Sequence, residues 1–167
     1  MVIHEDFLSY GKLDSDIAII LLREDITFND SVQPIRLATK DYKLSNGTDA
    51  VISGWGYKSY PQNLPDILQK LTVKIITVEK CRNIWKDVSL SKIDEGMICA
   101  QSLNSSLNQG LCRGDSGGPL VTKDGIQVGI ANMILYCGYA NKVPDVYTSI
   151  IYYADWINQT IEKLIGN

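Results

Sequence analysis

The chain has few of the features that mark membrane and nucleic-acid-binding proteins. No apolar run approaches the roughly 20 residues that span a bilayer, so a membrane-spanning segment is not expected. There is no block of basic residues, and the net charge is -3, which argues against a nucleic-acid or polybasic membrane surface. Low-complexity tracts and internal repeats are also absent. The 167 residues are 45% hydrophobic, enough for the core of one soluble globular domain.

Histidine is almost absent, because His4 is the one histidine in the sequence. It lies far from the cysteines, and no two cysteines have C-x-x-C spacing, so we expect no zinc site, no other metal and no cofactor. The even number of cysteines instead predicts two disulfides and an oxidising compartment. The cysteines are Cys81, Cys99, Cys112 and Cys137. Four N-x-[ST] sequons, at Asn29, Asn46, Asn104 and Asn158, are compatible with secretion.

A secretory leader is also missing from the printed sequence. Met1–Asp6 contain neither a basic n-region nor an apolar h-region. The sequence therefore has the cysteines of a secreted protein without the signal peptide of one. We expect that it is truncated and that further residues precede Met1 in the full-length form.

Most of the chain has the pattern of an all-β protein. Asp16–Leu22 is a compact apolar run that predicts a buried strand, and Leu71, Val73 and Ile75 alternate with polar residues as in a half-buried strand. Further short strands are predicted at 51–56, 97–100, 119–121, 126–131 and 146–150, which suggests a sandwich or barrel. A short helix is predicted over residues 77–85. Apolar residues at four-residue spacing from Tyr153 to Ile165 predict an amphipathic helix that ends at Gly166.

The stretch Gly114-Asp115-Ser116-Gly117-Gly118-Pro119 has the composition of a nucleophilic site. Small residues let a substrate carbonyl approach the serine hydroxyl, and they let backbone N–H groups turn toward a developing oxyanion. The alternative is a glycine-rich turn whose Asp and Ser only hydrogen-bond the local backbone. The flanking sequence favours the nucleophilic site.

An ordered set of motifs resembles the chymotrypsin/trypsin family of serine proteases over nearly the whole chain. The motifs are Asp16-Ile17-Ala18-Ile19, Ser53-Gly54-Trp55-Gly56, Met97-Ile98-Cys99-Ala100, Cys112-x-Gly114 to Pro119, Pro144-x-Val146-Tyr147, and a last helix with Trp156. The resemblance implies an all-β, trypsin-like double β-barrel with a C-terminal α-helix. Residues 1–37 would be the remnant of an incomplete first barrel, and residues 38–167 would form the complete second barrel.

The family resemblance also implies roles and pairings for individual residues. Ser116 would be the catalytic nucleophile, the N–H groups of Gly114 and Ser116 would form the oxyanion hole, and Asp16 would orient the catalytic histidine. Asp115 would pair with a freshly cut amino terminus. Cys81 would join Cys99, and Cys112 would join Cys137 across the specificity pocket.

The specificity pocket departs from the trypsin pattern. Gly110 stands at the floor position where trypsin-like members have an aspartate, and Leu111 follows it. Asp145 replaces a glycine of the family and should point into the pocket, as in some chymotrypsin-like and collagenolytic invertebrate members; the alternative is a carboxylate that is solvated or paired with Lys142. The remaining pocket residues are Asn132, Met133 and Ile134 in the wall and Arg113 at the mouth. Ile134 should narrow the entrance, and Arg113 favours acidic neighbours in the substrate.

The family's catalytic histidine lies in an A-A-H-C segment that this sequence does not contain. His4 fits the family's surface H-P/E-x-[YF] segment better, so we interpret it as a surface histidine. We therefore expect a secreted, extracellular serine endopeptidase, monomeric, acting on proteins or peptides and open to macromolecular protease inhibitors. The 167-residue chain itself should be inactive. The alternative is a non-catalytic homologue that uses the same cleft to bind a partner.

Overall fold

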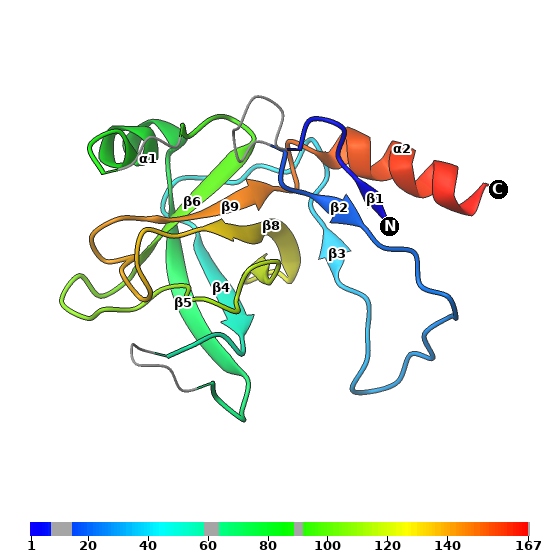
Figure 1. Ribbon diagram of the computed structural model, residues 1–167, viewed down its shortest axis with the longest axis horizontal. Helices are drawn as coiled ribbons and strands as arrows, with labels where there is room; N and C mark the ends of the chain where they lie inside the picture. Colours follow the sequence, from blue (N-terminus) through cyan, green and yellow to red (C-terminus); the bar gives the residue numbers. More distant parts are fainter. Residues whose placement is uncertain (8–14, 59–63, 89–91, 167) are drawn as a thin grey trace.

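The computed structural model describes residues 1–7, 15–58, 64–88 and 92–166. These residues form short strands at the N-terminal end, a β-barrel and two helices (Figure 1). In chain order the elements are β1 (Val2–Ile3), β2 (Ala18–Ile19), β3 (Arg36–Leu37), β4 (Asp49–Gly54), β5 (Gln69–Ile76), α1 (Val78–Trp85), β6 (Met97–Ser102), β7 (Pro119–Thr122), β8 (Ile126–Met133), β9 (Asp145–Ser149) and α2 (Ala154–Ile165). The expected all-β architecture with a C-terminal helix is confirmed.

Six antiparallel strands close the barrel in the order β8-β7-β4-β5-β6-β9, and β9 pairs back onto β8. The alternation read from the sequence explains the inner face: Ala50 and Ile52 of β4 are buried, and so is Val73, which pairs with Ala50 across the ladder. Leu120 and Val128 are completely buried in the same core. Each large aliphatic side chain buried in this way contributes about 1.5–3 kcal/mol. The expectation of a complete barrel in the second part of the chain is therefore confirmed.

The N-terminal part forms much less sheet than the barrel does. β1 and β2 form a separate two-stranded sheet, and β3 adds to the edge of the barrel by pairing in parallel with β8. The prediction of a buried strand over Asp16–Leu22 is wrong. Only Ile17 of this run is fully buried, whereas Ile20, Leu21 and Leu22 are more than half exposed. Among the described strands, β2 pairs with β1 alone.

Helix α1 begins and ends as its sequence predicts. Thr77 is the N-cap, and its side chain accepts a hydrogen bond from the Lys80 amide (3.1 Å). The helix turns Cys81 and Trp85 inward, and the Cys81–Cys99 disulfide fixes it to β6. The Trp85 indole donates to the Pro144 carbonyl (2.9 Å), so α1 also supports the segment that leads into β9.

Helix α2 packs through its first half. Tyr153, Ala154 and Ile157 are buried, while Ile165 at the other end is 70% exposed. His4 lies against this helix, with its ring 5.2 Å from that of Tyr153 and 4.8 Å from that of Trp156. Its side chain is only 9% exposed, so the interpretation of His4 as a surface histidine is wrong. The aromatic side chains of α2 cover it.

Candidate active site

The loop that carries Ser116 is fixed to β8 directly after the serine. The Gly117 amide donates to the Ala131 carbonyl, and the Ala131 amide donates to the Gly118 carbonyl, each with a donor–acceptor distance of 2.8 Å. Gly114 and Gly117 have φ values of +97° and +82°, a backbone region that favours glycine. These glycines make the sharp bend that leaves Ser116 exposed at the surface.

Two amides of this loop remain open to solvent or a ligand. Within the part of the chain that the structure describes, neither the Gly114 nor the Ser116 amide donates a hydrogen bond. Both belong to exposed residues and flank Asp115. Unpaired N–H groups next to a serine hydroxyl are the arrangement that can stabilise an oxyanion on an attacked carbonyl.

The Asp115 side chain ties the loop to neighbouring backbone segments. Its carboxylate accepts hydrogen bonds from the Gly56 amide (2.8 Å) and the Cys112 amide (3.0 Å). A Cβ on Gly54 would lie 2.1 Å from Asp115 Oδ1, so only glycine fits there. The glycines of the Gly54-Trp55-Gly56 segment make room for this carboxylate. The sequence did not reveal that Gly56 is its hydrogen-bond donor.

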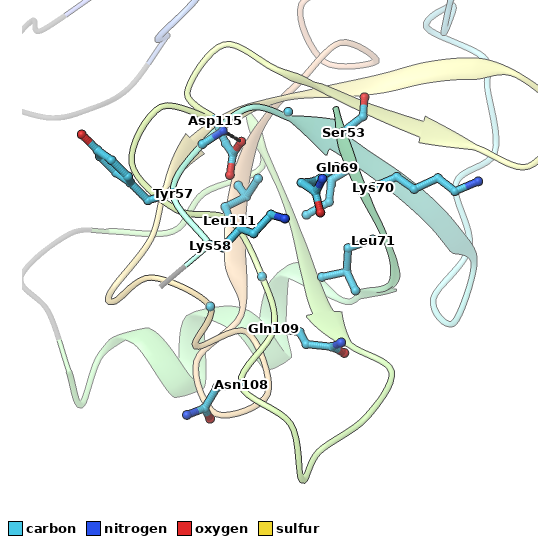
Figure 2. Close-up of a pocket in the computed structure, with 15 residues that line it drawn as sticks. Ser53, Tyr57, Lys58, Gln69, Lys70, Leu71, Asn108, Gln109, Leu111 and Asp115 are labelled. Atoms are coloured by element: carbon cyan, nitrogen blue, oxygen red, sulfur yellow. Dashed lines mark hydrogen bonds between the residues drawn. The ribbon is translucent and has the colours of Figure 1, made fainter. Parts of the chain in front are cut away.

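A pocket of about 240 Å³ opens beside Asp115. It lies between the loop of Gly56, the start of β5 and the segment before Cys112, and Figure 2 shows Asp115 at one end and Asn108 at the other. Lys58 and Lys70 also line it. The Asp115 carboxylate, half-buried and held by backbone amides, is available to a cation that enters this space.

Gly110, Leu111 and Asp145 come together in the interior. Asp145 is 1% exposed, and its Oδ2 accepts a hydrogen bond from the Leu111 amide (2.7 Å). The alternative of a solvated Asp145 is therefore wrong. A Cβ on Gly110 would lie 2.7 Å from the same Oδ2, so the glycine at 110 and the carboxylate at 145 fit each other sterically. Burial raises the pKa of the Asp145 carboxyl to about 8; the Leu111 hydrogen bond opposes the rise and the Asp115 charge adds to it.

The other predicted pocket residues lie on β8 or in the loops beside it and beside Cys112. Cys112 is joined to Cys137, so both disulfides are those that the family resemblance implies. Met133 pairs with Val146 between β8 and β9, and Ile134 packs against the main core. Arg113 is exposed, and its carbonyl accepts a hydrogen bond from the Tyr57 amide.

Asp16 is linked to the serine loop through backbone and side-chain contacts. The Thr148 hydroxyl donates to the Asp16 carbonyl (2.9 Å) and accepts from the Asn132 side-chain amide (3.0 Å). Asn132 follows Ala131, which anchors the Ser116 loop. Partial burial raises the pKa of the Asp16 carboxyl. His4 does not join this group: its ring contacts are with Tyr153 and Trp156 on α2.

The roles of two polar side chains near the site could not be predicted from the sequence. Thr148 lies on β9 among buried residues, and nothing in its neighbourhood in the sequence marks it as the link to Asp16. Tyr147 belongs to a recognised motif, yet its buried hydroxyl has no hydrogen-bond partner among the described residues. Burial raises the pKa of this hydroxyl well above its ordinary value. No cluster of potential metal ligands occurs in the described ranges.

The family model described as Trypsin matches residues 1–157. Trypsin-1 of Astacus astacus is 35% identical over 160 residues, which cover 94% of this chain and 64% of the relative. Kallikrein-8 of Mus musculus is 40% identical over 150 residues, covering 89% and 54%. The solved structure of neuropsin, a serine protease expressed in the limbic system of mouse brain, superposes with a TM-score of 0.82 at 36% identity, covering 96% of this chain and 69% of neuropsin.

The chain spans about a third to two thirds of the length of the curated relatives it matches. Some of those relatives are named transmembrane proteases, such as transmembrane protease serine 11C of Mus musculus, at 37% identity over 94% of this chain and 36% of that protein. Neither described helix is long and apolar enough to cross a membrane.

Proposed function

Because the chain belongs to the trypsin family of serine proteases, we propose that it is the part of a serine endopeptidase that carries the nucleophile and the specificity pocket. Ser116 Oγ attacks the carbonyl carbon of a peptide bond, and a histidine oriented by Asp16 takes the hydroxyl proton. The oxyanion is held by the amides of Gly114 and Ser116. The amine leaves with a proton from that histidine, and water then hydrolyses the acyl-enzyme.

One observation carries this proposal: Ser116 is exposed on a rigid loop whose neighbouring amides are unpaired. A loop whose role was only to turn the chain would direct these donors to carbonyls of its own backbone. Instead, Asp115 and Ala131 hold the loop, and the donors at Gly114 and Ser116 stay free. Losing one such donor typically lowers the rate by about 10²–10³.

We place the first-barrel remnant at residues 1–37 and the second barrel at residues 38–167. In the full-length form, the ammonium of a processed amino terminus would enter the 240 Å³ pocket and pair with Asp115. The two disulfides support an extracellular location. Proteins or peptides would be substrates, and macromolecular protease inhibitors would bind the same cleft.

The buried pair of Gly110 and Asp145 supports a mixed primary specificity. The carboxylate below Gly110 can accept a basic side chain, whereas its protonated form leaves an environment suited to apolar side chains. Ile134 restricts the size of the group that enters. Profiling the full-length form on a peptide library tests this specificity: strong cleavage after large aromatic residues would contradict it.

For the 167-residue chain we propose that Ser116 has no base. The sequence contains one histidine, and His4 is covered by Tyr153 and Trp156 rather than joined to Asp16. The test is labelling of the folded chain with a fluorophosphonate probe, with Ser116→Ala as the background control. We expect no labelling above that control. Stoichiometric labelling of Ser116 would show that another group serves as the base.

The same position of His4 favours, as the second candidate, a non-catalytic homologue that binds a partner in the cleft. A full-length form with an A-A-H-C segment would be labelled by the probe, whereas a binding protein would retain the cleft and stay unlabelled. Labelling of the full-length form therefore separates the two candidates.

A further inference from the structure

A second pocket lies on a part of the barrel that no residue of the candidate active site lines. It has a volume of about 420 Å³ and is formed where β5 runs into α1, where β6 begins and where the chain leaves β9. Leu44, Ile75, Met97, Ile151 and Tyr152 give it a largely apolar lining. Its volume lies in the range of pockets that bind small ligands.

The rim of this pocket offers an aromatic platform. Tyr152 is 60% exposed while still lining the pocket. A tyrosine ring held at a surface presents a large apolar face together with a polar hydroxyl, which suits a ligand that is itself part apolar and part polar. The C–H face of a pyranose ring has this character.

Asn46 also lines the pocket, and it is the acceptor residue of the sequon Asn46-Gly47-Thr48. Two backbone hydrogen bonds hold this turn against β5: Gly47 N–H to the Ile75 carbonyl (2.8 Å) and Ile75 N–H to the Thr48 carbonyl (2.9 Å). Gly47 has a φ of +84°, so the turn has a fixed shape. Asn46 is exposed, and within the described ranges its side-chain amide makes no hydrogen bond.

The other three sequons lack this environment. The side-chain oxygens of Asn29 and Asn104 accept hydrogen bonds from the amides of Ser31 and Ser106 in their own loops. The third, Asn158, lies within α2, and its sequon threonine, Thr160, is buried. None of the three lines the apolar pocket.

We propose that Asn46 carries an N-linked glycan whose first N-acetylhexosamine covers this pocket, with its C–H face on Tyr152. The Asn46 amide nitrogen forms a bond to the anomeric carbon of a lipid-pyrophosphate-linked oligosaccharide and loses a proton; the anomeric C–O bond breaks and the lipid pyrophosphate leaves. The proposal rests on the extracellular location proposed above, but it does not depend on Ser116 chemistry.

The test is secretion of the full chain from a glycosylating eukaryotic cell behind a cleavable signal peptide. Mass spectrometry before and after removal of N-glycans gives the occupancy of each sequon. We expect Asn46 to be occupied. Thermal unfolding is then compared for the intact glycoprotein, for protein trimmed to a single sugar per site, and for Asn46→Gln. The first two should agree, and Asn46→Gln should unfold about 2–4 °C lower, the shift that one modest interaction gives in a chain of this size.

Two variants separate contact with the pocket from a general effect of glycans. Ser106→Ala removes the sequon of Asn104, which is away from the pocket, and keeps the hydrogen bond from the amide of residue 106 to Asn104, so it should leave the Tm unchanged. Tyr152→Ala should lower the Tm more in the glycoprotein than in the Asn46→Gln variant. Only the glycoprotein has an Asn46 sugar that loses its contact with the Tyr152 ring. An empty Asn46 overturns the proposal, whether or not other sequons are occupied. Equal effects of Tyr152→Ala in both backgrounds overturn the contact. Fluorophosphonate labelling is unaffected by either result, so failure here is distinct from failure of the proposed function.

Discussion

At the scale of single residues, Asp145 is the most perturbed carboxyl in the candidate site. Its pKa is raised from 3.8 to about 8, mainly by burial. The folded protein therefore binds this proton more tightly than the unfolded chain does. The stabilisation is fully present below about pH 4 and is lost as the pH rises through about 8.

We predict that the free energy of unfolding falls between pH 5 and pH 8, by up to about 1.4 kcal/mol per pH unit, the value for one proton. Asp145→Asn keeps an acceptor for the Leu111 amide and should flatten this slope. Denaturant unfolding at several pH values measures it. The matched control is Asp49→Asn: the pKa of the partly exposed Asp49 is lowered to about 2 by Lys123 and Lys74, so its contribution is lost only in more acidic solution. An unchanged slope in Asp145→Asn would contradict the prediction.

Several residue-scale features could be predicted because they lie in short contiguous motifs. The glycines around Ser116 are needed at fixed positions of one loop, so their spacing alone indicates the loop. The contacts of Asp115 with Gly56 and of Thr148 with Asp16 join residues 59 and 132 positions apart. No local pattern encodes such pairs. Only the folded chain brings them together.

At the scale of elements, helix α1 depends on its cap. It is only eight residues long, and a helix of that length is marginal without caps and tertiary contacts. Thr77→Ala removes the acceptor of the Lys80 amide and should lower the free energy of unfolding by about 1 kcal/mol. Thr77→Ser retains the hydroxyl and should lose much less. Urea unfolding of the unglycosylated protein compares them, and equal losses in the two variants would show that the cap hydrogen bond is not the cause.

An element could be predicted from its sequence where the chain also contains the strands or helices that pack against it. β5 is paired with β4 and β6, and α1 is joined to β6 by a disulfide, so the apolar residues of both elements are buried as their spacing predicts. The Asp16–Leu22 run has the composition of a buried strand, yet most of it is exposed. Apolar composition shows what a segment can bury, but not whether a partner is present to bury it.

At the scale of the whole molecule, stability is concentrated in the barrel. Six strands close on themselves, and both disulfides lie within this part of the chain. Closure leaves no free edge between β8 and β9. The N-terminal residues contribute little to this core: besides the two-residue strands, their main anchors are Ile17 and the packing of His4 on α2.

The N-terminal part therefore presents several apolar side chains that the described residues leave uncovered. Ile20, Leu21, Leu22, Ile26 and Phe28 are each at least 50% exposed within one short stretch. Exposed apolar side chains close together in the chain bind hydrophobic dyes and promote association. We predict that the folded chain binds the dye anilinonaphthalene sulfonate and that the double variant Leu22→Lys/Phe28→Lys binds markedly less. Dye fluorescence measures this at a protein concentration where light scattering shows no aggregates.

The same double variant should leave the free energy of unfolding within about 0.5 kcal/mol of the parent, because side chains already in solvent contribute little to stability. The matched control is Ile67→Lys, which removes a single exposed apolar side chain outside this stretch and should change dye binding little. A loss of stability of several kcal/mol in the double variant would mean that Leu22 and Phe28 are buried in solution. The N-terminal part would then pack onto the barrel or onto a second copy of the chain and cover these two side chains.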